Sequence, residues 1–270
     1  MSHTRLRLLW GVGSAALLCG VAIVSAQSTL GTAQSFAVLG GSTVTNTGSS
    51  VITGDLGVSP GSAVTGFPPG TVTGTIHAGD ATAGQAQNDA TTYYNTLAAA
   101  ACTADLTGQD LGGLTLTSGV YCYSTSAQLT GPLTLDAQGS ADAVFIFKIG
   151  STLTTASNSS VLLINGGNPC GVNWQVGTSA TLGTTTSFIG NLVALSSVTL
   201  NTGADIIGRA LARNGAVTLD ANEITFAPCG PLSPVPTLAT WAVIALVGLL
   251  ALAGVAALRR RHAEAGHPGH

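Results

Sequence analysis

Two pairs of oppositely charged residues come nearest to a catalytic arrangement in this sequence. They are Asp205 with Arg209, and Arg213 with Asp220. Polysaccharide lyases and hydrolases need paired carboxylates, or a carboxylate and a base, that converge in one groove. Each pair here supplies one acid and one base on neighbouring turns, which is typical of a surface salt bridge. Lys148, the only lysine, lies among apolar residues and is expected to be paired or to extend along the surface. The sequence therefore predicts that the protein is not an enzyme.

Cysteine and histidine could bind a metal, but their spacing argues against it. No two of the five cysteines are two to four residues apart, as in zinc sites, and His77 is the only histidine between the two ends of the chain. Cys102, Cys122, Cys170 and Cys229 form an even set, which in an oxidising compartment indicates disulfides. Three pairings are possible. We favour Cys102–Cys122, which brackets one loop, and Cys170–Cys229, which ties down the last strand. We expect no metal and no cofactor.

Threonine recurs at a regular spacing in the middle of the chain. Between residues 115 and 219 a Thr-Leu pair occurs six times, at steps of 19, 18, 29, 18 and 19 residues, beginning at Thr115, Thr134, Thr152, Thr181, Thr199 and Thr218. Helical repeats are longer, whereas 18 to 19 residues with Gly and Asn at the turns fits one coil of a β-solenoid with three short strands. In Ser197-Val198-Thr199-Leu200 the apolar and hydroxyl residues alternate, as in a half-buried strand.

One segment interrupts the strand pattern. From Ala81 to Ala101 the sequence is Ala-rich, and Ala86, Ala90, Tyr93, Leu97 and Ala101 follow helical spacing. Asp80 is a suitable N-cap, and Thr82 with Gln85 offers an alternative capping box. We expect one helix over about 81–101 that packs its Tyr and Leu side against the solenoid.

The composition excludes several functional classes. Only 7% of the residues are charged, 45% are hydrophobic and 36 are Gly. A nucleic-acid-binding protein needs a basic surface, and the net charge here is −3. Coiled coils and long exposed helices need more Glu, Lys and Arg than this chain has. The surface must be made polar by Thr, Ser, Asn and Gly.

The two ends of the chain explain a mean hydropathy of +0.45. Residues 1–26 resemble a cleaved secretory signal, with an uncleaved anchor as the alternative. Residues 238–258 carry no charge and precede three arginines, as expected of a transmembrane helix with a cytoplasmic basic end. Val235-Pro236-Thr237-Leu238 and the segment after it resemble an Ile-Pro-Thr-Leu sorting tail of bacterial surface proteins. That resemblance implies export, with residues 232–270 either removed by a membrane protease or kept as an anchor. The predicted mature domain, residues 27–231, is acidic.

Several motifs in the right order are similar to the ice-binding (antifreeze) protein family of bacteria, fungi and algae. They cover about residues 30–229 and comprise Leu30–Ala33, Phe36–Gly40, Ile52–Gly61, Phe145–Ile149, Asn173–Gly183, Gly208–Ala212 and Gly215–Asp220. The resemblance implies a mainly β, discontinuous right-handed parallel β-solenoid, in which segments from both ends of the chain share the stack and one long helix lies alongside. It also implies adsorption to ice, and we expect a monomer.

A solenoid that binds ice needs a flat face of small hydroxyl residues. Stacked strands bring one residue of each coil into register, and the Thr methyl excludes bulk water while its hydroxyl holds an ordered one. We expect this face to contain Thr115, Thr134, Thr152, Thr155, Thr181, Thr184, Ser197, Thr199, Thr202 and Thr218. The alternative is a cell-surface structural or adhesin-like solenoid, in which Thr is only a good strand residue on a solvated face.

Overall fold

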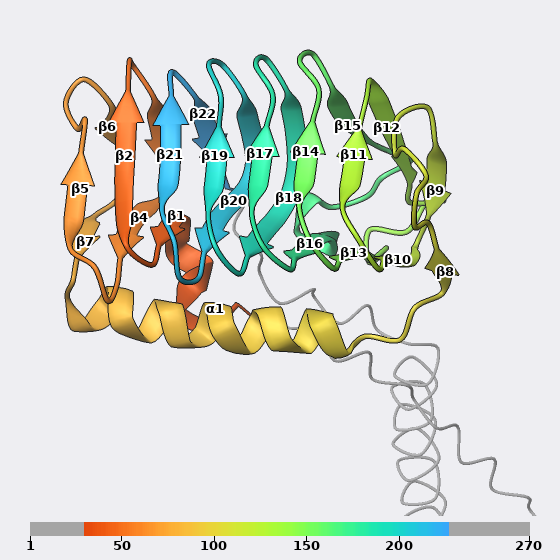
Figure 1. Ribbon diagram of the computed structural model, residues 1–270, viewed down its shortest axis with the longest axis horizontal. Helices are drawn as coiled ribbons and strands as arrows, with labels where there is room; N and C mark the ends of the chain where they lie inside the picture. The colour runs from red at the N-terminus through yellow and green to blue at the C-terminus, as the bar shows by residue number, and fades with distance from the viewer. Residues whose placement is uncertain (1–29, 227–270) are drawn as a thin grey trace, which may run out of the picture.

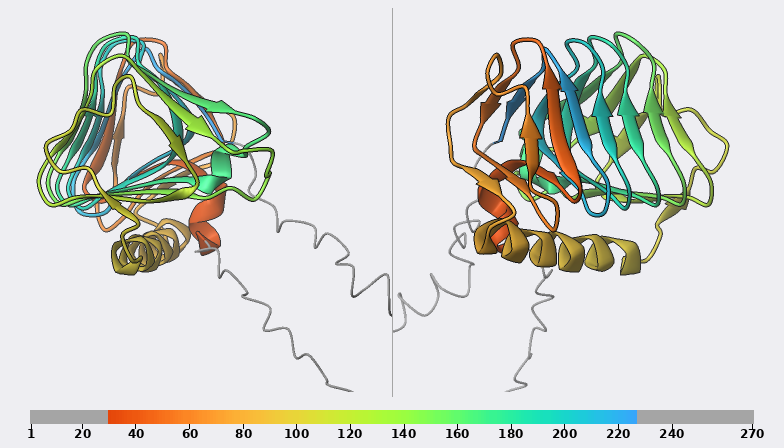
Figure 2. Two further views of the ribbon diagram at one scale, coloured as in Figure 1. Left: turned by 90° about the vertical axis from the view of Figure 1, so that its right-hand side faces the viewer. Right: turned by 60° about the vertical axis from the view of Figure 1, so that its left-hand side comes forward.

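The computed structural model describes residues 30–226, which form a three-sided solenoid of parallel strands with one long helix along one side (Figures 1 and 2). This confirms the predicted mainly β solenoid; its handedness stays a prediction. The helices are η1 (Gly31–Ser35), α1 (Ala81–Ala99) and η2 (Pro169–Gly171). The strands are β1 (Phe36–Gly40), β2 (Thr43–Thr47), β3 (Val51–Thr53), β4 (Asp55–Val58), β5 (Ala63–Thr65), β6 (Thr71–Val72), β7 (Ile76–Ala78), β8 (Ala104–Asp105), β9 (Thr115–Thr117), β10 (Gly119–Tyr123), β11 (Ala127–Leu129), β12 (Pro132–Asp136), β13 (Phe145–Ile149), β14 (Leu153–Thr155), β15 (Ser160–Ile164), β16 (Val172–Val176), β17 (Ala180–Leu182), β18 (Ser187–Ala194), β19 (Val198–Leu200), β20 (Asp205–Ala212), β21 (Val217–Asp220) and β22 (Glu223–Thr225).

Two sheets make the three sides. The seven-stranded sheet, in the order β11-β14-β17-β19-β21-β2-β5, is one side. The fifteen-stranded sheet supplies the other two, because β18 and β20 turn a corner in their middle. Gly190 and Gly208 pair at this corner with φ of 119° and 148°. A Cβ on Gly208 would lie 2.0 Å from the carbonyl oxygen of Gly190, so only glycine fits the stacked bend.

The order of the coils in space differs from their order in the chain. The first coil after the N-terminus stacks on the last coil before Phe226, since β2 pairs with β21 and β3 pairs with β22. All of these pairs are parallel. The discontinuity implied by the family resemblance is therefore present, and the N-terminal coils extend the same stack (Figure 1).

Helix α1 returns the chain from one end of the stack to the other. Its 19 residues span about 28 Å at 1.5 Å each, close to the roughly 29 Å covered by six strand spacings of about 4.8 Å. Asp80 caps the helix as predicted, accepting a hydrogen bond from the Ala83 amide at 2.8 Å. Ala86, Ala90, Tyr93 and Leu97 are buried against the sheet as expected. Ala101 is exposed beyond the helix end, so the predicted helix was two residues too long.

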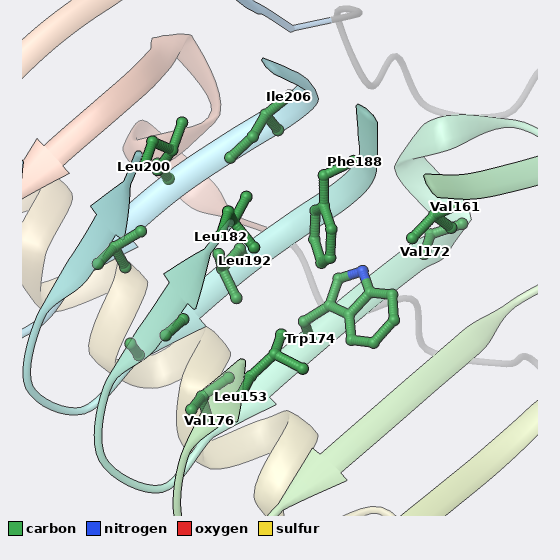
Figure 3. Packing of buried hydrophobic residues seen from close by; sticks show 14 of the residues in the cluster. Leu153, Val161, Val172, Trp174, Val176, Leu182, Phe188, Leu192, Leu200 and Ile206 are labelled. Carbon is green, nitrogen blue, oxygen red and sulfur yellow. The ribbon is translucent and has the colours of Figure 1, made fainter. Parts of the chain in front are cut away.

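Aromatic residues fill the interior at one end of the solenoid. Phe147 and Trp174 are paired across β13 and β16, and their rings stack with centres 3.9 Å apart. Tyr121 and Phe188 continue the stack on either side, and aliphatic residues fill the coils beyond (Figure 3). The indole N–H of Trp174 donates to the carbonyl oxygen of Ile189 at 3.0 Å. A continuous apolar core thus holds the three sides together.

The predicted Cys102–Cys122 disulfide is present and closes the segment after helix α1 onto β10. Cys170 is disulfide-bonded as well. Its expected partner Cys229 lies outside the described residues, as do the predicted signal segment 1–26 and tail 232–270. Within residues 30–226, no helix is long and apolar enough to cross a membrane.

Candidate functional site

The seven-stranded sheet has an outer face whose central positions are almost all threonine. Its strands alternate inward and outward side chains, and most of the inward ones are apolar. The central outward positions are in register from strand to strand, in the order Gln128, Thr154, Thr181, Thr199, Thr218, Thr45 and Thr65. We call this sheet the Thr sheet and these seven residues its central row.

The central row is regular because the strands stack without a change of register. Neighbouring strands are about 4.8 Å apart, so six consecutive threonines follow one another at that interval. The β-branched Thr side chain has few rotamers, which favours the same orientation on each strand. The hydroxyls of Thr45 and Thr218 are close enough to hydrogen-bond, at 3.4 Å. Figure 1 shows the strands of this sheet side by side along the whole length of the solenoid.

A second row of small residues runs beside the central row on the side where the strands begin. Continuing the same register by two residues toward the start of each strand gives Ser126, Thr152, Ser179, Ser197, Ala216, Thr43 and Ala63. We call these residues the leading row. It lies about 6.7 Å from the central row, the length of two residues along a strand. All of its members carry a hydroxyl or a methyl group, so the two rows form a surface with no large side chain except Gln128.

One charged residue lies in the strands of the Thr sheet. Asp220, at the end of β21, is paired with Thr47 of β2 and accepts a hydrogen bond from the Thr202 hydroxyl. The other charged residues near this part of the chain, Asp205 and Glu223, lie on β20 and β22 in the other sheet. The two rows themselves carry no charge.

Most of the predicted site residues lie on or beside this surface. Thr181, Thr199 and Thr218 are in the central row, and Thr152 and Ser197 are in the leading row. Thr184 and Thr202 are exposed in the turns that follow β17 and β19, at the edge of the sheet.

Three of the predicted residues do not belong to this surface. Thr155 is 3% exposed, its hydroxyl lies 2.8 Å from that of Thr186, and it accepts from the Gly183 amide. It follows the outward Thr154 by one residue and so must point inward. Thr115 and Thr134 pair with each other on β9 and β12, in the fifteen-stranded sheet. These three assignments were wrong, because a Thr-Leu pair has the same in–out alternation on every side of a solenoid.

Sequence reasoning missed four members of the central row. Thr154 was missed because the Thr-Leu alignment chose Thr152, two residues earlier, and Gln128 was missed because the Thr-Leu pair of its coil, at Thr134, lies on β12 in the other sheet. Thr45 and Thr65 were missed because they come from the N-terminal coils. The alternation in Thr43-Val44-Thr45 was a signal for an outward Thr, but it did not indicate which side the strand joins.

The charged pairs considered as catalytic do not form. Arg213 donates to the Thr91 hydroxyl at 3.2 Å and lies 4.5 Å from the centre of the Tyr94 ring, while Asp220 bonds to Thr202. Asp205 accepts from the backbone amide of Glu223. The predicted surface salt bridges were therefore wrong.

Arg209 is buried between helix α1 and the solenoid. Its Nη1 donates to Asn191 Oδ1 at 2.8 Å and its Nη2 donates to the Gln34 carbonyl oxygen at 2.6 Å. The guanidinium also lies 4.9 Å from the centre of the Phe226 ring. Burial lowers the pKa of Arg209 to about 10, so the side chain stays protonated at neutral pH. Arg209 of β20 thus contacts both Gln34, near the start of the described residues, and Phe226, at their end.

Lys148 is paired, as predicted, and its contact is structural. Its Nζ donates to the carbonyl oxygen of Ala100 at 2.6 Å, at the C-terminal end of helix α1, where a positive charge is favourable. Among residues 30–226, no group of His, Cys, Asp and Glu is arranged to hold a metal ion. The candidate site is thus a surface, and its chemistry is that of ordered hydroxyl and methyl groups.

Comparison of the sequence with known proteins identifies its relatives. Residues 38–225 match the family described as ice-binding-like, and residues 233–261 match the IPTL-CTERM motif. The ice-binding protein of Nostoc sp. (strain HG1) is 63% identical over 201 residues, which are 74% of this chain and 74% of that protein.

Solved structures agree with the fold. An ice-binding protein from an Antarctic biological consortium superposes with a TM-score of 0.72 and 46% identity, over 83% of this chain and 96% of that one. An ice-binding protein from the Antarctic ascomycete Antarctomyces psychrotrophicus superposes with a TM-score of 0.71 and 43% identity, over 73% of this chain and 97% of that one. With its solenoid, its helix and its sequence all in agreement, the chain belongs to the ice-binding-like family.

Proposed function

We propose that this protein adsorbs to ice through the Thr sheet and thereby inhibits ice growth and recrystallisation. The central row supports this most directly, because six threonines in register on a flat sheet repeat one methyl and one hydroxyl at a constant interval. Methyl groups keep bulk water away while hydroxyls hydrogen-bond to waters that take up a regular order. Relatives of this chain are named ice-binding proteins, which supports the same function.

Rigidity also favours this surface over the other sides. The Thr sheet is backed by buried aliphatic residues, including Leu182, Leu200 and Leu219, which are at most 1% exposed. One of the two sides formed by the fifteen-stranded sheet contains β22 and the first residues of β20. It carries Asp205 and Glu223 next to the exposed Ile207. Paired carboxylates hold water firmly, and such a side is a poor template for ice.

The test is a bulky substitution in the centre of the Thr sheet with a matched substitution elsewhere. Thr199→Tyr places a ring on the central row, and Ile207→Tyr places the same ring on an exposed strand of the other sheet. We expect thermal hysteresis and recrystallisation inhibition of residues 27–231 to be lost in Thr199→Tyr and kept in Ile207→Tyr. Absence of both activities in the unmodified protein, or equal activity in the two variants, would refute the proposal. Glycan binding in place of ice activity would favour an adhesin.

The C-terminal motif supports a location at the cell surface. The IPTL-CTERM motif is a sorting signal, and it implies an exported protein. We propose further that residues 1–26 are a cleaved signal and that residues 238–258 hold the domain at the membrane until or unless the tail is removed. Both ends of the described chain adjoin the fifteen-stranded sheet, since Leu30 and η1 precede β1 and Phe226 follows β22. Fractionation of cells into membrane, wall and medium, with an antibody to the domain, tests this location.

A further inference from the structure

A third row of outward positions borders the Thr sheet on the side where its strands end. It follows the central row by two residues and includes Thr47 and Asp220, which are paired, with Asn201 and Ala156 in the neighbouring coils. We call it the trailing row. The three residues named beside Asp220 are neutral and small or amidic, much like the leading row on the opposite border.

Asp220 is fixed in this row by contacts on three sides. Its Oδ2 accepts a hydrogen bond from the Thr202 hydroxyl in the neighbouring coil. Its amide donates to Asn222 Oδ1 at 2.6 Å, and its carbonyl oxygen accepts from the Gly203 amide at 3.0 Å. A Cβ on Gly48 would lie 3.5 Å from Asp220 Oδ1, so this oxygen faces the next coil. The residue is half-buried, and its carboxylate cannot swing away from the surface without losing the hydrogen bond from Thr202.

A carboxylate in this position is chemically unlike the rest of the surface. An ionised carboxylate only accepts hydrogen bonds, whereas a hydroxyl or an amide both donates and accepts. Every water molecule in ice donates two hydrogen bonds and accepts two, so waters around a carboxylate are oriented against that pattern. Removing those waters from an ion is costly. The trailing row therefore stays hydrated near Asp220, although Thr47 and Asn201 in the adjacent coils would suit an ice-facing surface.

We infer that Asp220 sets the border of the ice-contacting surface and limits it to the leading and central rows. The inference rests on the proposed function and adds which rows carry it. Asp220 is thus a specificity-determining residue, since it determines how wide a strip of ordered water the sheet can present.

Two aspartate substitutions on one strand test the border. Thr43 and Thr47 lie on β2, two residues before and two residues after Thr45, in the leading and trailing rows respectively. Thr43→Asp should reduce thermal hysteresis about tenfold or more, because it puts a charge that must be dehydrated inside the contact surface. Thr47→Asp should leave the activity within about twofold of the unmodified protein, because its row is already outside the contact.

A second pair of variants tests whether the charge of Asp220 limits the width of the ice-contacting surface. Asp220→Asn keeps the shape and an acceptor but removes the charge, and Asp205→Asn does the same in the other sheet. Asp220→Asn should raise thermal hysteresis by about half, in proportion to an increase from two rows to three. Asp205→Asn should have no effect. Circular dichroism and thermal unfolding of all four variants check that the fold is kept.

The outcomes separate this inference from the proposed function. An unmodified protein without thermal hysteresis refutes both. An active protein in which Thr47→Asp is as damaging as Thr43→Asp, or in which Asp220→Asn matches Asp205→Asn, overturns the inference alone.

Discussion

Replacing Arg209 with Met should lower the stability of the solenoid by about 2–4 kcal/mol. Arg209 is fully buried and donates hydrogen bonds to Asn191 Oδ1 and to the Gln34 carbonyl oxygen. Met keeps the length of the apolar stem but removes both donors, and a buried polar group that loses its hydrogen-bond partner costs about 1–3 kcal/mol. Part of this cost is offset, because the burial of a guanidinium that lowers its pKa to about 10 is itself unfavourable.

Thermal and urea unfolding of residues 27–231 measure this loss. For a domain of about 200 residues, 3 kcal/mol corresponds to a decrease in Tm of roughly 6–12 °C. Arg213→Met is the matched control, because Arg213 is only half-buried and donates one side-chain hydrogen bond, to the Thr91 hydroxyl. Its loss should stay below about 1 kcal/mol. An Arg209→Met protein as stable as the unmodified one would show that desolvation of the guanidinium cancels its hydrogen bonds, and the reasoning above would be refuted.

Two further predictions concern the helix and the segment that follows it. The pKa of Asp80 is lowered chiefly by the Ala83 amide, and that of Asp89 chiefly by the Thr32 hydroxyl, so their stabilising contacts are complete above the ordinary Asp value of 3.8 and are lost as the pH falls below it. The Tm should therefore be level between about pH 7 and 5 and fall toward pH 3, with a smaller fall in Asp89→Asn; a Tm unchanged at pH 3 contradicts this. The Cys102–Cys122 disulfide closes a loop of 20 residues, so the Cys102→Ser, Cys122→Ser double variant should lose about 3 kcal/mol in urea unfolding. A loss below about 1 kcal/mol would show that the loop is already ordered without the bond.

Local patterns in the sequence predicted the elements of the fold well. The helix could be located because Asp80 is a strong N-cap and Ala86, Ala90, Tyr93 and Leu97 form one helical stripe. The strands could be located because threonine alternates with an aliphatic residue, as in Val198-Thr199-Leu200. These signals depend on residues a few positions apart, and the tertiary structure does not alter them.

The composition of the candidate site could be predicted only in part. Thr181, Thr199 and Thr218 were found because successive coils are joined by short turns of similar length. Thr155 was misassigned because a shift of one residue reverses the direction of a side chain. Thr45 and Thr65 were not found because no sequence repeat shows that the N-terminal coils stack on the last coil. That order is decided by pairing between segments more than 170 residues apart, such as Thr45 with Thr218.

The stacking of the first coil on the last has a consequence for how the protein folds. Because β2 lies between β5 and β21, its edge away from β5 has no partner strand until nearly the whole domain has been synthesised. Pairing across such a distance in sequence is slow, since a long loop must close before any contact is made. A chain truncated before β21 also lacks the strand that joins Thr45 to Thr199, so only full-length molecules can assemble an unbroken row.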